Sequence, residues 1–541
     1  MQTFNIKSCF PFKQIRDQQQ EAVDFALESL INDDKKFVIV EAGTGVGKSA
    51  IGLTVAKYLL QNMNSPGDDY EAGSWFITTQ KILQDQYMRD FKSKGMMSVK
   101  SSRNHTCSHN KQHNCKDGQM MLKSCDKKSP QWKTCVFECP YKQEKKSFLE
   151  ASEGVTNFSY FLAETNFSGK VKPRNLLVID EAHNIENELS KFIQVSISER
   201  FASSALKVKW PGRSSQFQVV KWIREEYYPV ASIRLKHMED MIEKIGIGSR
   251  LDELKKIATS YDMLSGHVEK LKIFLTGYDK ENWVMEEVPG DGRMKRKYVF
   301  RPIDVSPWAN KYLFRCGKKV LMMSATILNK DAFCDNLGIK REEASFISIP
   351  SPFPVDSRQI HFFPVGKMTA REIDTTLPKL ASIVKEILKQ HKNEKGIIHC
   401  HSYKIANYLK RNIRSKRLLA HNSDNRDVIL AQHETSKSPT VLLSPSMSEG
   451  VDLRGDLSRF QILCKVPYPY LGDQIVKKRM NKRKSWYPLQ TAKTIVQSVG
   501  RSVRSMEDQA VTYILDQDWE RFYSRNKHFF PRDFKNSLKG M

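Results

Sequence analysis

The sequence predicts an α/β protein with parallel sheets, organised in two blocks, the first of which carries two insertions. Three observations lead to this fold class. Short apolar runs typical of buried parallel strands recur along the chain, and stretches with helical spacing separate them. A glycine-rich turn joins the first of these strands to a helix. At 541 residues the chain is too long for one hydrophobic core, so several domains are expected.

The first block starts with a predicted helix at 16–31, in which apolar residues recur on one helical face. The run KFVIVE at 36–41 predicts a buried strand, and AIGLTVAKYLLQ at 50–61 predicts the helix after the glycine-rich turn. Further strands of the same kind are predicted at 74–80, 175–180 and 319–326. Strands that alternate with helices in this way indicate a parallel sheet.

Two stretches interrupt this pattern. The first is rich in Cys, His and Lys, and the second has a helical pattern, clearest at 252–275. The second block has buried-strand candidates at 396–400, 440–444, 460–466 and 511–516, after an expected linker at 351–358. The predicted domains are a first domain at 1–91, 151–186 and 301–344, a Cys-rich insert at 92–150, a helical insert at 187–300, and a second domain at 345–541.

The charge balance favours a polyanionic partner. Lys and Arg number 87 against 61 Asp and Glu, a net charge of +26, which makes nucleic acid the simplest candidate. The N-terminus lacks the apolar segment of a secretory signal, and no apolar run is long enough to span a membrane. We therefore expect an intracellular protein, cytoplasmic or nucleoid-associated, in a reducing compartment that disfavours disulfides.

A phosphate-binding loop is predicted at EAGTGVGKSA, residues 41–50. The strand before it and the helix after it are the context that this motif requires. Lys48 would place a charge at the β- and γ-phosphates, and the Ser49 hydroxyl would bind Mg²⁺. The loop residues expected to hold the nucleotide are Ala42, Gly43, Thr44, Gly45, Val46, Gly47, Lys48 and Ser49.

A second part of the nucleotide site is predicted at LLVIDEAH, residues 176–183. This apolar strand ends in two carboxylates, of which Asp180 would hold Mg²⁺ and Glu181 would polarise the attacking water. Near the C-terminal end of the sequence, QSVGRSVR puts Arg501 and Arg504 three residues apart, on one face of a predicted helix. Arginines of a second domain could reach the γ-phosphate as arginine fingers.

Half of the ten cysteines lie in one short segment, residues 104–141, together with three histidines. Disulfides, zinc and an iron–sulfur cluster are the three candidates for their role. A reducing compartment argues for metal over disulfides. CSHNKQHNC could offer mixed Cys and His ligands to zinc, although the paired Cys-x₂-Cys spacing of common zinc modules is absent.

In the order and spacing of its motifs the chain resembles the XPD/DinG family of superfamily 2 DNA helicases. The matching stretches are RDQQ (16–19), EAGTGVGKS, ITTQKILQDQ (77–86), NFSYFL (157–162), VIDEAHN, MSAT, SPFP, IIHCHSYKIANYL (397–409), SPSMSEGVDLRG (444–455), KVPYPYLGD (465–473) and QSVGRSVR. The resemblance implies two RecA-like motor domains that close on ATP, with single-stranded DNA across both and 5′→3′ translocation. It also implies that the first insert carries a [4Fe–4S] cluster and that the second forms an arch.

The resemblance assigns roles to individual residues. Cluster ligands would be Cys107, Cys125, Cys135 and Cys139, with Cys115 as the alternative to Cys125. Nucleotide contacts would include Gln19 at the adenine, together with Glu449, Asp452 and Gln497. DNA contacts would come from Thr78, Thr79, Ser402 and Tyr403. The basic run at 477–487 either binds phosphate or forms a solvated face.

The function expected from these patterns is an ATP-dependent, Mg²⁺-requiring DNA helicase that acts on single-stranded or forked DNA in repair or replication. The alternative is an ATP-driven translocase or remodelling protein that does not unwind duplex, and zinc is the alternative to the cluster. We expect the chain to be a monomer and not to associate with a membrane. Its compact arch is compatible with a phage or other viral form, which would work in the host cytoplasm.

Overall fold

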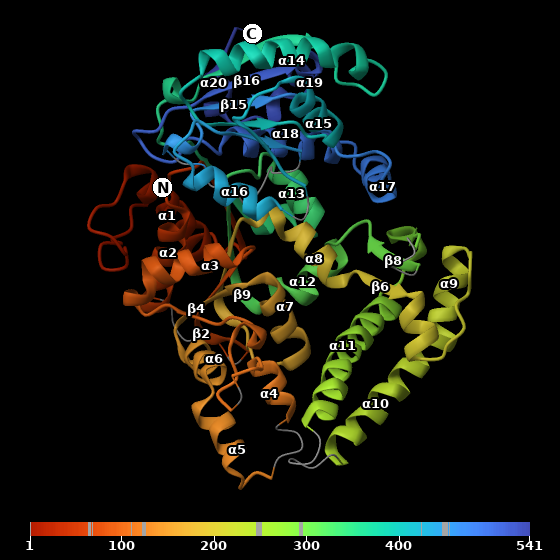
Figure 1. Ribbon diagram of the computed structural model, residues 1–541. Helices are drawn as coiled ribbons and strands as arrows, with labels where there is room; N and C mark the ends of the chain where they lie inside the picture. Colours follow the sequence, from red (N-terminus) through yellow and green to blue (C-terminus); the bar gives the residue numbers. More distant parts are fainter. Residues whose placement is uncertain are drawn as a thin grey trace.

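In the computed structural model of the chain, two α/β units lie one above the other (Figure 1). The structure describes residues 2–540, except 63–66, 68, 110, 122–125, 245–250, 291–295, 423–424, 446–452 and 454. Each unit is built on a seven-stranded sheet, and a third sheet of three strands lies in the second insert. No helix among the described residues is long and apolar enough to cross a membrane.

The first unit is built on a parallel sheet with the order β10-β1-β9-β5-β2-β4-β3. Its strands are β1 (Phe37–Ala42), β2 (Glu71–Thr78), β3 (Met97–Ser98), β4 (Glu153–Asn157), β5 (Arg174–Asp180), β9 (Gly317–Ser324) and β10 (Ala344–Ile349). Every residue of β1 and β5 is buried, as expected for strands covered on both faces. The strands predicted in this block are confirmed, and the sheet continues through β10, a few residues past 344.

Helices cover both faces of this sheet. The helices of the first unit and its Cys-rich insert are α1 (Asp17–Leu27), α2 (Lys48–Asn62), α3 (Lys81–Phe91), α4 (Cys115–Met121), α5 (Pro130–Lys133), α6 (Pro140–Glu150), α7 (Phe158–Ala163), α8 (Ile185–Ile193), α12 (Ser306–Tyr312) and α13 (Lys330–Leu337), of which α4 and α5 lie in the insert, away from the sheet. Successive side chains of β2 point to opposite faces of the sheet and so belong to two different cores. Phe76 packs with α1 and α2, whereas Trp75 and Ile77 pack on the other face. That second core continues without interruption into the second insert, so the two share one apolar interior.

The second insert contains a sheet that the helical pattern did not predict. Its elements are β6 (Val195–Ser198), α9 (Gln216–Trp222), α10 (Tyr228–Lys244), α11 (Leu251–Thr276), β7 (Trp283–Val288) and β8 (Lys297–Pro302). The three strands pair antiparallel in the order β6-β8-β7 at the base of the long helices. The expectation of a helical insert is therefore right for α10 and α11 and wrong for the base. Strand β6 lies about 100 residues from its partner β8, so local periodicity carries no signal of the pairing.

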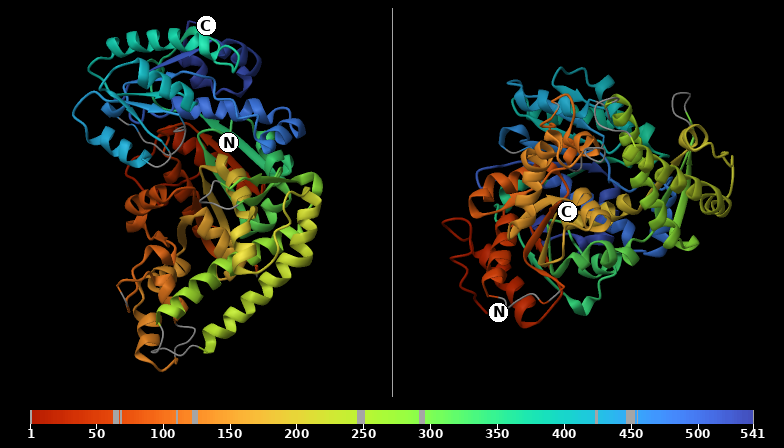
Figure 2. Two further views of the ribbon diagram at one scale, coloured as in Figure 1. Left: turned by 45° about the vertical axis from the view of Figure 1, so that its right-hand side comes forward. Right: turned by 90° about the horizontal axis from the view of Figure 1, so that it is seen from below.

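The two inserts meet at the far end of the first unit. Helices α10 and α11 run down to the Cys-rich insert, as the views in Figures 1 and 2 show. Asp262 of α11 forms ion pairs with Arg103 and Lys116 of that insert, with 3.3 Å between Arg103 Nη2 and the carboxylate. The Cys-rich insert and the second insert, which interrupt the first sheet at different places, are thus in direct contact.

The second unit is also built on a parallel sheet, with the order β13-β14-β12-β15-β16-β11-β17. Its strands are β11 (Ile360–Gly366), β12 (Gly396–His399), β13 (Leu418–Ala420), β14 (Val441–Ser444), β15 (Phe460–Leu463), β16 (Val511–Asp516) and β17 (Leu538–Lys539). Its helices are α14 (Ile373–Gln390), α15 (Tyr403–Asn412), α16 (Arg426–Thr435), α17 (Gln474–Lys482), α18 (Trp486–Val499), α19 (Asp518–Asn526) and α20 (Arg532–Ser537). The four strands predicted here are confirmed, and the chain therefore has the expected two parallel-sheet motor domains.

Helix α17 fastens the second motor domain to the first. Arg479 pairs with Glu186 at 2.7 Å, and its Nε donates to the carbonyl of Ile303 at 2.8 Å. Lys482 and Arg483 each lie 2.9 Å from one carboxylate oxygen of Asp304. The run at 477–487 was predicted either to bind phosphate or to be solvated. Half of its Lys and Arg residues instead form ion pairs between the domains.

A bidentate ion pair joins the start of α17 to β8, and its removal is expected to weaken the clasp. The two guanidinium nitrogens of Arg301 lie 3.0 and 3.1 Å from the two oxygens of Asp473. In a double-mutant cycle with Arg301→Gln and Asp473→Asn, we expect a coupling of about 1 kcal/mol in the free energy of unfolding, since the pair is only partly buried. Denaturant unfolding of the four proteins measures it, and purely additive effects would contradict the pairing. Asp473→Asn keeps the cap on the Ile475 N–H.

Candidate nucleotide-binding site

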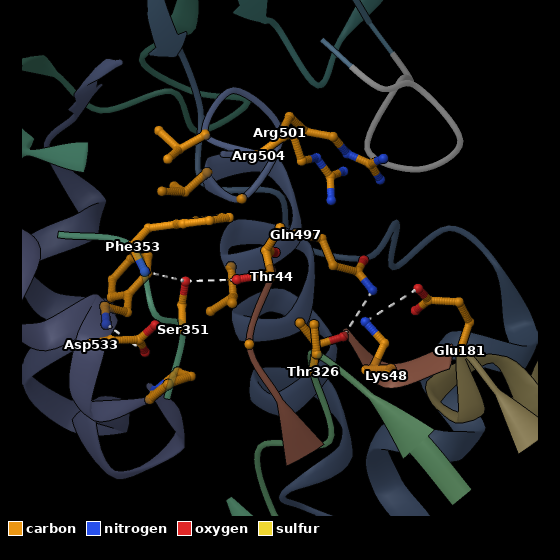
Figure 3. Close-up of a pocket in the computed structure, with 18 of the residues that line it drawn as sticks. Thr44, Lys48, Glu181, Thr326, Ser351, Phe353, Gln497, Arg501, Arg504 and Asp533 are labelled. Atoms are coloured by element: carbon orange, nitrogen blue, oxygen red, sulfur yellow. Dashed lines mark hydrogen bonds and ion pairs between the residues drawn. The ribbon is translucent and has the colours of Figure 1, made fainter. Parts of the chain in front are cut away.

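A cleft of about 770 Å³ lies between the two motor domains. The first domain contributes the glycine-rich loop, the residues after β5 and those after β9, and the second contributes the end of α18 and the turn that follows it. Figure 3 shows Lys48 and Glu181 facing Gln497 across this cleft. Because the carboxyl ends of parallel strands meet at one edge of a sheet, segments far apart in the chain converge here.

The loop after β1 has the backbone of a phosphate-binding loop. Gly45 and Gly47 hold φ angles of +89° and +91°, in the left-handed region that favours glycine. A Cβ on Gly45 would lie 2.1 Å from the ring of Phe353, so the linker residue packs directly on the loop. The Ser351 hydroxyl donates to the carbonyl of Thr44 at 2.7 Å. The linker between the domains thus supports the loop as well as connecting the sheets.

The structure places Gln19 beneath the same loop. Its Nε2 donates to the carbonyl of Val46 at 2.8 Å, and its Oε1 accepts from the Arg16 N–H at 3.1 Å. The side chain is buried, and a Cβ on Gly47 would lie 2.5 Å from its nitrogen. In this arrangement the Gln19 amide braces the loop, and its contact with adenine stays a prediction.

Two acidic residues at the end of β5 differ in their electrostatic environment. Burial raises the pKa of Asp180 to about 6, helped by the neighbouring Glu181 charge and opposed by Lys48. Burial also acts on Glu181, but the positive charges of Lys48, His183 and the two arginines outweigh it and hold its pKa below the ordinary value. Lys48 Nζ lies 3.9 Å from Glu181 Oε1. Glu181 is therefore the carboxylate that is more firmly ionised, and a cation next to Asp180 would favour its ionised form.

The backbone of Glu181 is strained, with φ at +53°. A residue with a Cβ adopts this left-handed conformation at a cost, and such strain is concentrated at functional sites. The conformation turns the chain out of β5, so that the Glu181 side chain faces the cleft while Asp180 stays buried. Burial lowers the pKa of the adjacent His183 to about 4, and its Nδ1 shares a hydrogen bond with the Ser324 hydroxyl at 2.8 Å.

The second domain reaches the site through the end of α18. Gln497 Nε2 donates to Thr326 Oγ1 at 3.1 Å, which joins QSVGRSVR to the SAT segment after β9. Arg501 and Arg504 line the cleft, and both contribute to the lowered pKa of Glu181. They do not lie on a helical face as predicted, because α18 ends at Val499 and both occupy the turn after it. A turn aims the two guanidinium groups into the cleft (Figure 3).

Several residues that sequence reasoning did not single out complete the site. Tyr87 of α3 donates from its hydroxyl to Asp180 Oδ2 at 3.1 Å, and Glu41 lines the cleft beside Ser348. Burial raises the pKa of Glu41. Tyr87 lies in a helix and Glu41 near the end of a strand, positions that are typical of the core. Only their contacts in the folded chain identify them as residues of the site. Glu449 and Asp452 lie outside the described residues.

The predicted DNA contacts fall at the carboxyl edges of the two sheets. Thr78 ends β2 and is buried, and its hydroxyl donates to the carbonyl of Gln80, whereas Thr79 lines the cleft. In the second domain, Ser402 precedes α15 and Tyr403 starts it, with the Tyr403 ring 48% exposed. The structure thus leaves Tyr403 the most accessible of the four, and their contacts with DNA stay predictions.

Four buried thiols gather in the Cys-rich insert. Cys115 Sγ and Cys139 Sγ lie 3.0 Å apart, and a Cβ on Gly118 would lie 2.7 Å from Cys107 Sγ and 4.0 Å from Cys135 Sγ. Burial and the Cys139 thiol raise the pKa of Cys115 to about 12. Among the described side chains no group of three His, Cys, Asp or Glu residues could hold a metal ion as it stands, and no disulfide forms. Four thiols are nevertheless the number and chemistry that a cubane cluster requires.

The fourth predicted ligand, Cys125, lies outside the described residues, so its place in the set stays a prediction. Cys115, named as its alternative, is the thiol that the structure brings to the other three. The reason is a backbone pairing that joins the segments before and after it, with hydrogen bonds from Cys107 N to the carbonyl of His113 and from Cys115 N to that of His105. Spacing in the sequence carries no sign of this pairing.

Comparisons with known proteins agree with this architecture. The family model "Type III restriction enzyme, res subunit" matches residues 12–207, and "Helicase C-terminal domain" matches residues 384–537. The chain is 23% identical to "ATP-dependent DNA helicase YoaA" of Haemophilus influenzae over 70% of its own length and 66% of that protein's. It is 22% identical to "Probable ATP-dependent helicase MJ0942" of Methanocaldococcus jannaschii over 98% of this chain and 96% of the relative.

Solved structures show the same fold. "XPD_Helicase" superposes with a TM-score of 0.63 at 16% identity, covering 96% of this chain and 98% of that chain. The structure of S. tokodaii Xpd4 gives a TM-score of 0.58 at 16% identity, covering 97% and 99%. The two motor sheets, the cleft between them, the family models and the relatives agree with one another. Together they support an XPD/DinG-like helicase ATPase of superfamily 2.

Proposed function

We propose that this protein is an ATP-dependent DNA helicase that translocates 5′→3′ on single-stranded DNA and uses Mg²⁺ to hydrolyse ATP. One observation carries the proposal. Lys48 and Glu181 of the first motor domain, with Asp180 buried next to Glu181, face Gln497, Arg501 and Arg504 of the second across one cleft. The relatives named as ATP-dependent DNA helicases and the net charge of +26 support DNA as the partner.

The cleft residues have separable tasks in ATP hydrolysis. The backbone N–H groups of 43–49 and the Lys48 ammonium would hold the phosphates, and Ser49 and Asp180 would hold Mg²⁺, whose charge favours the ionised form of Asp180. Glu181 would orient and polarise the water, because it keeps its charge beside Lys48. Arg501 and Arg504 would stabilise the charge that develops on the γ-phosphate.

Nucleotide binding would draw the two domains together, and this closure would drive movement along DNA. Gln497 and Thr326 already touch across the cleft, so a ligand held by both sides favours the closed state. Thr78, Thr79, Ser402 and Tyr403 would hold the strand at the carboxyl edges of the two sheets. A change in the separation of the domains would then shift one set of contacts relative to the other.

The Cys-rich insert would hold a [4Fe–4S] cluster through Cys107, Cys115, Cys135 and Cys139. When bound, the cluster would cross-link the segments that carry these four cysteines. Its ligands must be thiolates, so binding would displace the thiol protons. The Asp262 contacts would pass the rigidity of the insert to α11.

The activity is tested by ATP hydrolysis with and without single-stranded DNA. We expect the rate to rise several-fold with single-stranded DNA and to change little with blunt duplex of the same length. Strand displacement from forks with a single 5′ or 3′ tail tests unwinding and polarity, and displacement of streptavidin tests translocation without unwinding. Hydrolysis that does not respond to any nucleic acid would overturn the proposal, and streptavidin displacement without strand displacement would identify the translocase.

A further inference from the structure

An exposed aromatic side chain lies in the loop between β15 and α17. Tyr470 is 80% exposed, the largest exposed fraction among the large hydrophobic residues that the structure describes. Its loop, KVPYPYLGD, leaves the carboxyl end of β15, which pairs in parallel with β12. His399 is the register partner of Leu463, so Tyr403 and Tyr470 leave neighbouring strands at the same edge of the sheet.

The loop holds the Tyr470 ring in place although solvent surrounds it. A Cβ on Gly472 would lie 2.2 to 2.3 Å from the ring atoms and the hydroxyl, so the ring lies over the bare backbone of that glycine. The Asp473 N–H donates to the carbonyl of Tyr470 at 3.1 Å and closes a turn. The ring thus contacts Gly472 and otherwise lies largely in solvent, which leaves it available for stacking.

The loop is braced on both sides. On one side, Tyr468 stacks on Tyr487 with ring centroids 5.9 Å apart and planes 6° apart, and the Tyr487 hydroxyl donates to the carbonyl of Pro469 at 3.1 Å. On the other side, Asp473 is held by Arg301 of β8, where the second insert returns to the first motor domain. A stacking partner therefore meets a pre-ordered surface and has little chain entropy to overcome.

The basic residues of α17 and the position after it fall into two groups, one in ion pairs and one exposed to solvent. Arg479, Lys482 and Arg483 form the clasp to the first motor domain, whereas Lys477 and Lys478 are exposed in the first two turns of the helix. The two exposed ammonium groups follow Tyr470 by seven and eight residues. Single-stranded nucleic acid binds to exposed aromatic rings through its bases and to nearby cations through its phosphates, and this loop and the helix after it supply both kinds of group.

We propose that Tyr470 is a base-stacking platform that extends the single-stranded DNA site of the second motor domain beyond Ser402 and Tyr403, with Lys477 and Lys478 on the adjacent phosphates. The inference rests on the proposed function and adds a contact to it. Stacking on a ring tolerates any base, so the platform would grip the strand without reading its sequence. Because Asp473 of the same loop is clasped to the first domain, the platform would follow the movement between the domains.

The test compares Tyr470→Ala with Tyr470→Phe, which keeps the ring and removes only the hydroxyl. Phe363→Ala is the matched control, since Phe363 is a 51% exposed ring on β11 of the same domain. We expect Tyr470→Ala to weaken binding of a fluorescein-labelled single-stranded oligonucleotide by about tenfold, the effect of losing one stacked base. Tyr470→Phe and Phe363→Ala should bind like the unaltered protein. Hydrolysis of ATP without DNA should be the same in all four.

A second readout reports stacking itself. Oligonucleotides that carry one 2-aminopurine at successive positions should show a position whose fluorescence depends on the ring and is lost in Tyr470→Ala alone. Equal affinity of Tyr470→Ala and an unchanged 2-aminopurine profile would overturn the inference, while the unaltered protein still bound DNA. Failure of the unaltered protein to bind single-stranded DNA would instead overturn the proposed function.

Discussion

Replacement of Glu181 by Gln is expected to lower kcat for ATP hydrolysis by about 10²- to 10⁴-fold, the range that general-base residues contribute. The amide has the shape of the carboxylate but cannot polarise the water. ATP binding should persist, because Lys48 and the loop backbone are unchanged and one negative charge near the γ-phosphate is removed. The measurement is steady-state phosphate release together with equilibrium binding of a fluorescent ATP analogue.

The contrast with two other variants makes this result specific. Glu520→Gln, at an exposed position of α19, makes the same chemical change far from the cleft residues and should leave both readouts unaltered. Lys48→Ala should lose binding as well as turnover, since it removes the charge that meets the phosphates. Turnover by Glu181→Gln at a rate close to the unaltered protein would show that another group activates the water.

Substitution of the gathered thiols is expected to remove the metal centre. Protein purified without oxygen should contain about four irons and four acid-labile sulfides per chain. Cys107→Ser, Cys115→Ser, Cys135→Ser and Cys139→Ser should each lose most of the iron and the visible absorption, because each removes one of four thiolates. Unwinding should fall with the cluster, whereas ATP hydrolysis without DNA should be largely retained, since none of these thiols lines the cleft.

Cys125→Ser decides the ligand set. Full iron content in this variant, with loss in Cys115→Ser, would assign the fourth position to Cys115, and the reverse result would assign it to Cys125. Cys316→Ser is the control, because Cys316 is an equally buried thiol outside the insert. Zinc in place of iron, or a full complement of iron in all five insert variants, would contradict the proposed cluster.

The elements that form the nucleotide site were largely predictable from short stretches of sequence. The strand, glycine turn and helix around Lys48, and the strand that ends at Asp180 and Glu181, each depend on residues within about 15 positions of one another. The apolar runs of β1 and β5 are fully buried, as the sequence pattern predicts. Because both strands belong to one parallel sheet, their carboxyl ends lie at the same edge of it. The chemistry of the site follows from that edge.

Residues whose position depends on distant partners were predicted poorly or not at all. The hydrogen bonds of the Gln19 amide with Arg16 and Val46 carry no local sign in the sequence, and its contact with adenine stays a prediction. Arg501 and Arg504 read as a helical face, but Gly500 follows the last residue of α18 and leaves them in a turn. The antiparallel sheet β6-β8-β7 joins segments about 100 residues apart, and no local period marks it.

The basic run at 477–487 separates most clearly what the sequence determines from what the tertiary structure decides. Its composition alone established that positive charge accumulates at 477–487, because charge does not depend on folding. Only the packing of α17 against the first motor domain decided which of these charges are neutralised by Glu186 and Asp304 and which stay in solvent. Likewise, the sequence by itself determined that the chain has two motor sheets with a phosphate loop and a DEAH strand. The tertiary structure decided which side chains meet, since hydrogen bonds and ion pairs such as Gln497 to Thr326 form between groups that only the folded chain brings together.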